Sequence, residues 1–373
     1  MPRTPAFLAP CAAALCALGT LPLQAQANPA AAPWTVQFNT PAAPTTVTLY
    51  GVLDAYAEVG WNGVENVNRL QSGGLQGTRL GFKGAQELDK ANKVIFDLEM
   101  GVNVDQGTSG QGATFGRQAW VGLTGPWGTL TGGRQDTPEF IAMTTYGLGS
   151  GMAWGNASNY FADATSLRVN NALLYVSPKW HGLTFKGMYS FTGWNSSTSA
   201  PTTQPDTSTP SRQNVGHYAA VTGQYDRGPL SINLSHMVRK TTDSNQDKWS
   251  VGGASWDFKV AKLGVLYQRH TDDQRLTRNQ WWELNAYLPI GKDGLLLDGG
   301  SFRNQLAEHA NALAYSVRYD HNWTPQATIY GGFATIRNGQ KAAFGINGAT
   351  GSALAVAPAA CPRSVVLGFR YSF

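Results

Sequence analysis

Apolar and polar residues alternate along most of this chain, as they do in strands that have two different faces. Between residues 313 and 320, apolar side chains mostly alternate with polar ones (Leu313, Tyr315, Val317 and Tyr319 against Ser316, Arg318 and Asp320). A period of two is that of a β-strand, because successive side chains point to opposite faces of a sheet. A soluble sheet with one buried face has the same period, so the alternation predicts strands but not their surroundings.

The alternation recurs from residue 46 to the last residue of the sequence and predicts an all-β chain. We expect sixteen strands, at residues 46–61, 78–88, 93–104, 113–123, 128–135, 166–176, 184–191, 213–225, 230–240, 249–258, 261–270, 278–290, 294–302, 309–322, 326–335 and 364–373.

Short and longer connections alternate between these segments. The short ones are rich in Gly, Pro, Asp and Lys, and the mostly longer ones are residues 62–77, 105–112, 136–165, 192–212, 241–248, 271–277, 303–308 and 336–363. A membrane barrel has this layout, with tight periplasmic turns at one rim and long extracellular loops at the other. The predicted fold is therefore a sixteen-stranded antiparallel transmembrane β-barrel.

The first 27 residues have the features of a secretory signal peptide. Arg3 supplies the positive charge, residues 7–23 are mostly apolar, and Ala25-Gln26-Ala27 forms an A-x-A cleavage site. Residues 28–45 are rich in Pro and Ala, so we expect a flexible leader there and the barrel domain over residues 46–373.

The composition narrows the possible partners. Only 14% of the residues are charged, and the mild basicity (pI about 9.0) is too dispersed to predict nucleic-acid binding. Cys361 is the single cysteine after the signal segment, so neither an internal disulfide nor a cysteine metal site is expected. We expect no cofactor.

Short motifs along the chain are shared with one known family. They include Thr48-Leu49-Tyr50-Gly51, Ser72-Gly73-Gly74-Leu75, Thr78-Arg79-Leu80-Gly81-Phe82-Lys83-Gly84, residues 115–123, Gly132-Gly133-Arg134-Gln135, Arg168-Val169-Asn170-Asn171 and residues 369–373. In this order they resemble the sixteen-stranded general porins of Gram-negative outer membranes, most closely the β-proteobacterial branch. The leader at residues 28–45 departs from the family pattern, in which the first strand follows cleavage almost at once.

The resemblance carries expectations about partners and function. It implies a homotrimer in outer-membrane lipid and lipopolysaccharide, inserted by the barrel assembly machinery. It implies a water-filled channel for passive diffusion of ions and small hydrophilic solutes. The final aromatics Phe369, Tyr371 and Phe373 resemble the signature that this machinery reads.

A sixteen-stranded barrel encloses a wide lumen, so something must narrow it if the channel is selective. The resemblance implies that the loop 136–165 folds into the pore. That loop contains Asp136, Glu139 and Asp163, and the matching wall residues are Arg79, Arg117 and Arg168. Facing rows of opposite charge would create a field across the pore. The loop acids are equally compatible with solvated residues at the loop base, and Arg117 shares its phase with the outward Val121 and Leu123.

From their positions in the alternation, four other charged residues are also expected to face the lumen, namely Lys83, Glu99, Arg318 and Arg370. Basic wall residues favour weak anion selectivity, which we expect, whereas the loop acids favour cations. A substrate-specific channel is the main alternative, although the inward aromatics Trp281, Tyr287 and Tyr330 are too scattered for a binding track. An enzyme or an adhesin is a further alternative, and His270 near Asp272 and Asp273 is the one suggestive cluster.

Overall fold

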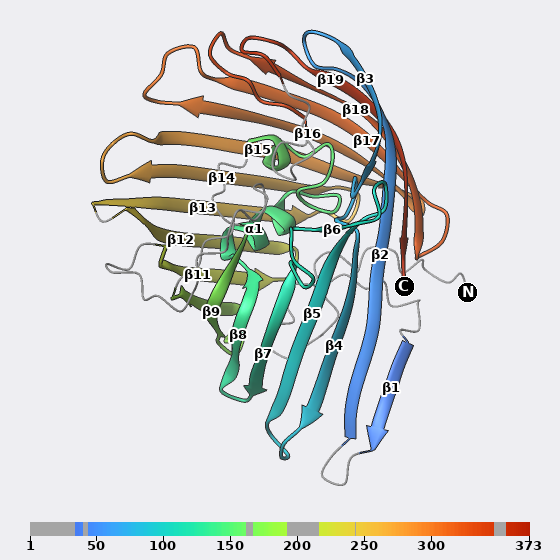
Figure 1. The fold of residues 1–373 in the computed structure, drawn as a ribbon, viewed down its shortest axis with the longest axis vertical. Coiled ribbons are helices and arrows are strands. Elements are labelled where there is room, and N and C mark those ends of the chain that lie inside the picture. Colours follow the sequence, from blue (N-terminus) through green and yellow to red (C-terminus); the bar gives the residue numbers. More distant parts are fainter. Residues whose placement is uncertain (1–33, 40–43, 162–166, 192–215, 243, 347–355) are drawn as a thin grey trace.

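The computed structural model describes residues 34–39, 44–161, 167–191, 216–242, 244–346 and 356–373. Within them, sixteen antiparallel strands pair in sequence and form a closed barrel (Figure 1). The barrel closes between β19 and β2, from Arg363 opposite Trp61 to Ser372 opposite Val52. Its strands are β2 (Pro44–Trp61), β4 (Arg79–Glu87), β5 (Lys93–Asn103), β7 (Gln118–Gly125), β8 (Gly128–Asp136), β9 (Arg168–Val176), β10 (Leu183–Ser190), β11 (Tyr218–Arg227), β12 (Leu230–Thr242), β13 (Asn245–Asp257), β14 (Lys262–Asp272), β15 (Arg278–Ile290), β16 (Asp293–Asn304), β17 (Ala312–Asn322), β18 (Ala327–Asn338) and β19 (Arg363–Ser372).

Each predicted segment overlaps one strand of the barrel, so the predicted fold is confirmed. The segment predicted at residues 113–123 begins too early, because β7 starts only at Gln118. Two short strands, β3 (Asn66–Ser72) and β6 (Thr108–Gly110), lie inside predicted loops and lengthen the hairpins of β2 and β5. The loop expected at residues 241–248 is shorter, because β12 and β13 continue their pairing to Thr242 and Asn245. The residues near this turn are polar on both faces of the strands, so the hydrophobic pattern does not show that the strands continue.

The leader was expected to be flexible, but it contains a strand. β1 (Trp34–Asn39) pairs antiparallel with the start of β2, from Trp34 opposite Leu49 to Asn39 opposite Pro44. β1 lies in line with β19, which pairs with the later part of the same strand. Apolar and polar residues alternate over only a few positions in residues 34–39, so the pattern does not predict a strand within this Pro/Ala-rich segment.

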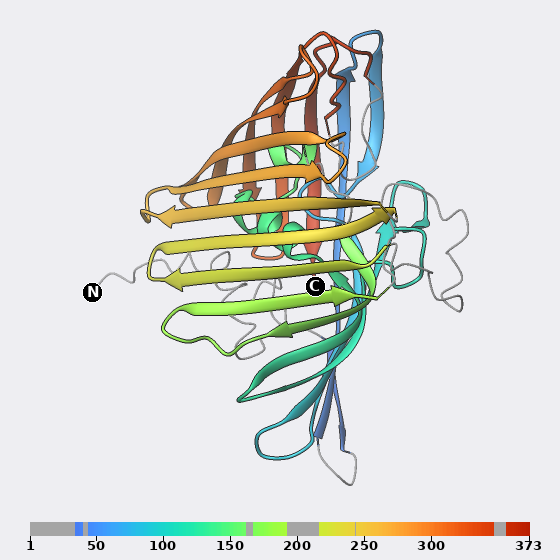
Figure 2. The same ribbon diagram turned by 90° about the vertical axis from the view of Figure 1, so that its left-hand side faces the viewer.

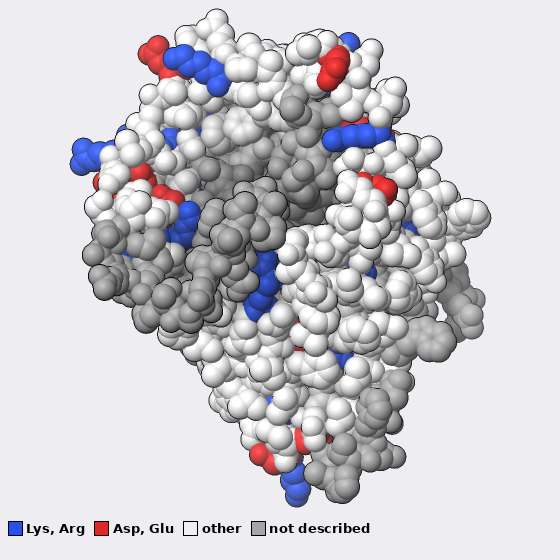
Figure 3. All heavy atoms as spheres, in the orientation of Figure 1, with Lys and Arg blue, Asp and Glu red and all other residues white. Residues whose placement is uncertain are grey.

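The barrel wall has an apolar outside and a polar inside. On β17, Leu313, Tyr315 and Val317 are 40%, 48% and 39% exposed, whereas the alternate residues Ser316 and Arg318 are buried. Lipid-facing and lumen-facing residues alternate in this way in membrane barrels. Figure 3 shows one face of the molecule, on which charged side chains are few and several of them lie at the edges.

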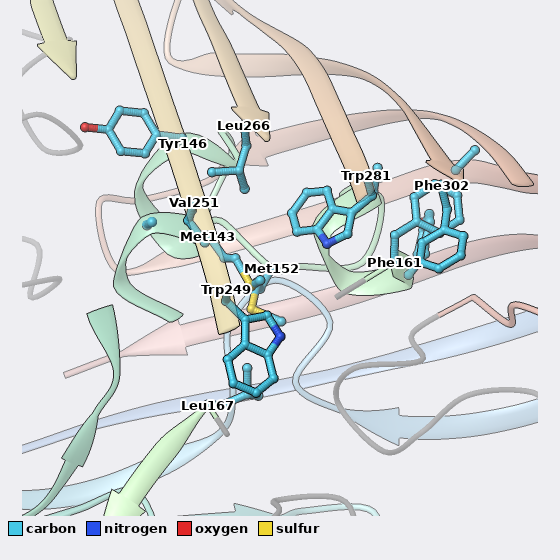
Figure 4. Packing of buried hydrophobic residues seen from close by; sticks show 14 of the residues in the cluster. Met143, Tyr146, Met152, Phe161, Leu167, Trp249, Val251, Leu266, Trp281 and Phe302 are labelled. Atoms are coloured by element: carbon cyan, nitrogen blue, oxygen red, sulfur yellow. The ribbon is translucent and has the colours of Figure 1, made fainter. Parts of the chain in front are cut away.

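The segment after β8 lies within the barrel and packs on its inner wall. It contains α1 (Pro138–Tyr146) and α2 (Ala157–Phe161), and no helix in the described residues is long and apolar enough to span a bilayer. Apolar residues of this segment pack on apolar residues of the wall (Met143, Tyr146, Met152 and Phe161 on Trp249, Val251, Leu266, Trp281 and Phe302; Figure 4). The main hydrophobic cluster therefore lies inside the barrel.

Candidate functional site

Two of the predicted wall arginines share one carboxylate. Nε of Arg79 lies 3.3 Å from Glu99 Oε2, and Nε of Arg117 lies 2.6 Å from Glu99 Oε1. Arg79 begins β4 and Glu99 lies on β5, where the alternation turns both side chains inward. Arg117 precedes the first residue of β7, so the outward phase of that strand does not apply to it. Its side chain comes close to Gly77, where a Cβ atom would lie 2.7 Å from Arg117 Nη1.

The third wall arginine pairs with a residue that we expected in the loop. Asp136 is the last residue of β8, and its Oδ1 lies 2.8 Å from Nε of Arg168 at the start of β9. The Arg168 guanidinium also lies over the ring of Phe140 in α1, 4.7 Å from its centroid. Asp136 therefore lies beside the arginines rather than facing them across the pore.

Sequence reasoning missed two members of this cluster, Tyr50 and Asp97. The Tyr50 hydroxyl donates to Asp97 Oδ1 (2.8 Å) and to Glu99 Oε2 (3.0 Å), and Lys83 Nζ lies 4.8 Å from the centre of the Tyr50 ring. Both residues have inward phase, and Asp97 pairs in register with Lys83, so phase and register together could have found them. The cluster thus holds four cations and three carboxylates (Arg79, Arg117, Arg168 and Lys83; Glu99, Asp97 and Asp136).

Glu139 lies away from the arginine cluster. It is buried in the first turn of α1 and interacts electrostatically with Tyr218 on β11 and Arg239 on β12. Its position follows from the start of α1, where Thr137 accepts a hydrogen bond from Phe140 N (3.3 Å) and Pro138 opens the helix. The third loop acid, Asp163, lies outside the described residues.

Contacts with the wall hold the loop in place along its length. The Tyr146 hydroxyl lies 2.9 Å from Ser231 Oγ and accepts from Gln224 Nε2 at 3.0 Å, and burial raises the pKa of Tyr146 to about 12. Further along, Glu283 accepts from Ser158 N at 2.6 Å and from Asn156 Nδ2 at 3.2 Å.

Arg318 also holds the loop. Its Nε lies 2.8 Å from Asp320, its Nη1 donates to Trp154 O at 2.6 Å, and its Nη2 donates to the carbonyl oxygen of Gly149. The residue is fully buried, so this inward arginine is a loop contact rather than an open part of the lumen surface.

The remaining predicted residues lie on the closing strand. Arg370 is half-buried and donates to Thr328 Oγ1 at 2.9 Å. The aromatic residues Phe369 and Tyr371 are 46% and 42% exposed on the outer face. Phe373 exchanges backbone hydrogen bonds of 3.0 and 3.1 Å with Gly51, which links the last residue to β2.

Comparisons with known proteins agree with this architecture. A family description, Gram-negative porin, matches residues 12–341. Outer membrane porin protein 32 of Delftia acidovorans is 27% identical over 89% of this chain and 95% of its own length. An outer membrane porin protein of Bordetella pertussis is 31% identical over 74% of this chain and 75% of its own length. The solved structure of an anion-selective porin from Comamonas acidovorans has a TM-score of 0.71 and 25% identity, and it covers 88% of this chain and 100% of its own.

Proposed function

The chain belongs to the Gram-negative porin family, and on that premise we propose that its arginine cluster makes the channel weakly anion-selective. The protein is an outer-membrane channel for the passive diffusion of small hydrophilic solutes and ions. Selectivity then depends on the fixed charges that border the lumen, because ions of opposite sign gain free energy near them.

The observation that carries this proposal is the charge balance of the cluster. Four cations and three carboxylates leave an excess of one positive charge around Glu99. The arginines are 9% exposed or less, so they act through their field rather than by direct contact with a passing ion. The loop acid Glu139 interacts with Arg239 on β12 rather than with this cluster, and Arg239 Nη2 also lies 3.5 Å from Asp247 Oδ2.

Planar-bilayer recordings of the purified protein in a salt gradient test the proposal. The parent channel should have a reversal potential of the anion-selective sign. Replacing Arg79 and Arg168 together by Ala should move that potential towards cation selectivity, whereas Arg79→Lys with Arg168→Lys, which keeps both charges, should not. A cation-selective parent, or an Ala variant that matches the parent, would contradict the role given to these arginines.

We also propose a general diffusion channel rather than a substrate-specific one or an enzyme. Trp281 and Tyr330 have only 1% of their surface exposed, so they offer no open aromatic track to a solute. His270 stacks on Trp249 at 4.4 Å between ring centroids, which gives it a packing role. The family resemblance further supports a homotrimer, cleavage of the signal after residue 27 and insertion by the barrel assembly machinery.

A further inference from the structure

Asp54 on β2 is a buried carboxylate that faces the inside of the barrel. Only 1% of its surface is exposed, whereas the preceding residue, Leu53, is 44% exposed on the outer wall. A buried carboxylate is stable only when hydrogen-bond donors surround it, because burial removes its water. The donors around Asp54 therefore identify the part of the chain that it holds.

Asp54 holds the connection between β3 and β4. We call residues 73–78 the inner turn. Asp54 Oδ1 accepts a hydrogen bond from Gly74 N at 3.1 Å, and Oδ2 accepts from Leu75 N and from Gln76 N, each at 2.8 Å. Consecutive backbone N–H groups can form a concave site for an anion, and here the Asp54 carboxylate fills it.

Further contacts fix the inner turn and Asp54 to the wall. The backbone oxygen of Asp54 accepts from Thr78 Oγ1 and from Gly73 N, each at 2.8 Å. The Tyr330 hydroxyl, on β18, donates to Asp54 Oδ1 at 2.7 Å. Leu75 is 2% exposed and belongs to the main hydrophobic cluster. The inner turn is therefore a fixed part of the inside of the barrel.

The inner turn contacts both of the arginines that share Glu99. Arg79 Nη1 donates to the carbonyl oxygen of Gly77 at 3.3 Å. A Cβ atom at Gly77 would lie 2.7 Å from Arg117 Nη1, so the backbone of the turn lies directly against that guanidinium group. The position of the turn therefore limits where the two guanidinium groups can lie.

The inner turn also contacts the loop that follows β8. Trp154 N donates to the carbonyl oxygen of Gly74 at 2.7 Å, and Trp154 O accepts from Arg318. The loop helices α1 and α2 lie inside the barrel, between the wall that faces the viewer in Figure 2 and the blue strand β2 behind them. The turn joins the second half of this loop to β2, beside the arginine cluster.

We propose that Asp54 is a positioning residue for the pore: it holds the inner turn, and the inner turn sets the positions of Arg79, Arg117 and Trp154. The inference rests on the proposed role of the arginine cluster in ion selectivity. Hydrogen bonds to a charged acceptor are about twice as strong as those between neutral groups, so one carboxylate can hold several backbone groups. Asp54→Asn keeps the shape of the side chain but turns an NH2 group towards backbone donors, so at least one of these bonds is lost.

The first test is amide hydrogen exchange of the purified protein in detergent, followed by mass spectrometry. In Asp54→Asn, peptides that cover the inner turn and Trp154 should exchange about tenfold faster, which corresponds to the loss of one hydrogen bond to a charged group. The matched control is Glu58→Gln, which removes the same charge from the same face of β2. Glu58 is as buried as Asp54 but bonds to Arg69 and Ser364, so these peptides should exchange at the parent rate.

The second test determines whether Asp54 acts through the arginines. Reversal potentials in a salt gradient are compared for Asp54→Asn in the parent and in a background with Arg79→Ala and Arg117→Ala. The substitution should shift the potential in the parent but not in the Ala background, where neither guanidinium group is left to displace. Equal shifts in both backgrounds would overturn the proposal, because the charge of Asp54 would then act on the ions itself. The comparison holds for either sign of the parent selectivity, so its failure is distinct from a failure of the proposed function.

Gly77→Ala tests the same contact while Asp54 stays in place, and it decides the outcome if Asp54→Asn does not fold. The added methyl group would displace the flexible end of Arg117, so the protein should still fold. The reversal potential should shift in the parent but not in a background with Arg117→Ala. An unchanged potential in the parent would overturn the proposal, as would a folded Asp54→Asn variant whose inner turn exchanges at the parent rate.

Discussion

At the scale of single residues, Glu99 determines how much of the arginine charge acts on the pore. Its two carboxylate oxygens each pair with one arginine, and the Tyr50 hydroxyl donates to one of them. Glu99→Gln removes one negative charge between Arg79 and Arg117. We expect a reversal potential further in the anion-selective direction, measured in the same salt gradient as for the parent.

Glu87→Gln is the matched control for Glu99→Gln, because Glu87 carries the same charge at the exposed end of β4. It should leave the reversal potential within the scatter of the parent. A shift of equal size in both variants would mean that the channel senses net charge rather than this cluster.

At Gly253 the loop approaches the wall closely. A Cβ at this position would lie 2.3 Å from Tyr146 Cδ2, and the Tyr146 hydroxyl is held by Ser231 and Gln224. Gly253→Val should lower the thermal unfolding midpoint in detergent, with a cost of about 1–3 kcal/mol from overpacking. Its outward neighbour Gly252 has its nearest atom at 3.6 Å, so Gly252→Val should cost much less, and equal losses would contradict the packing described.

At the scale of elements, Arg318 on β17 connects the wall to the second half of the loop. Arg318→Lys keeps the charge near Asp320 but loses the planar fork that reaches Gly149 and Trp154. The loop should then fluctuate between positions, and we expect greater noise in the open-channel current. Arg337→Lys, on the exposed face of β18, is the control and should record like the parent.

The strands could be predicted from the sequence because each has one face towards lipid and one towards the lumen. Apolar and polar residues therefore alternate along nearly every strand. The exceptions have physical causes. β3 and β6 extend beyond the apolar band, and the tip of the β12–β13 hairpin is polar on both faces. There the hydrogen-bond ladder continues without a hydrophobic signal.

The site could be predicted only in part for a related reason. Strand phase and family resemblance together identified Arg79 and Arg168, and inward phase identified Glu99. The partner of Arg168 depends on where β8 ends, and the surroundings of Glu139 depend on how α1 packs against strands far away in sequence. Such long-range contacts produce no periodic pattern of residues in the local sequence, so the local sequence does not predict them.

At the scale of the whole molecule, the barrel depends on the seam between β19 and β2. Deleting Phe373 removes two backbone hydrogen bonds to Gly51 and one outer aromatic. We expect a smaller folded fraction in the outer membrane, measured by heat-modifiable mobility on gels, with unchanged conductance for each channel that does insert. Phe373→Tyr keeps the backbone and the ring and should assemble like the parent. A deletion variant with normal assembly and altered conductance would contradict this role.

The seam has one more consequence. Phe373 lies opposite Gly51 and Trp34 lies opposite Leu49, on the same edge of β2 and with the two strands running in the same direction. A single inserted residue, opposite Tyr50, would therefore join Phe373 to Trp34 as one continuous strand. The topology of this barrel is accordingly that of a ring, and a circularly permuted gene opened at the Asp89–Asn92 turn would encode the same set of strand pairings.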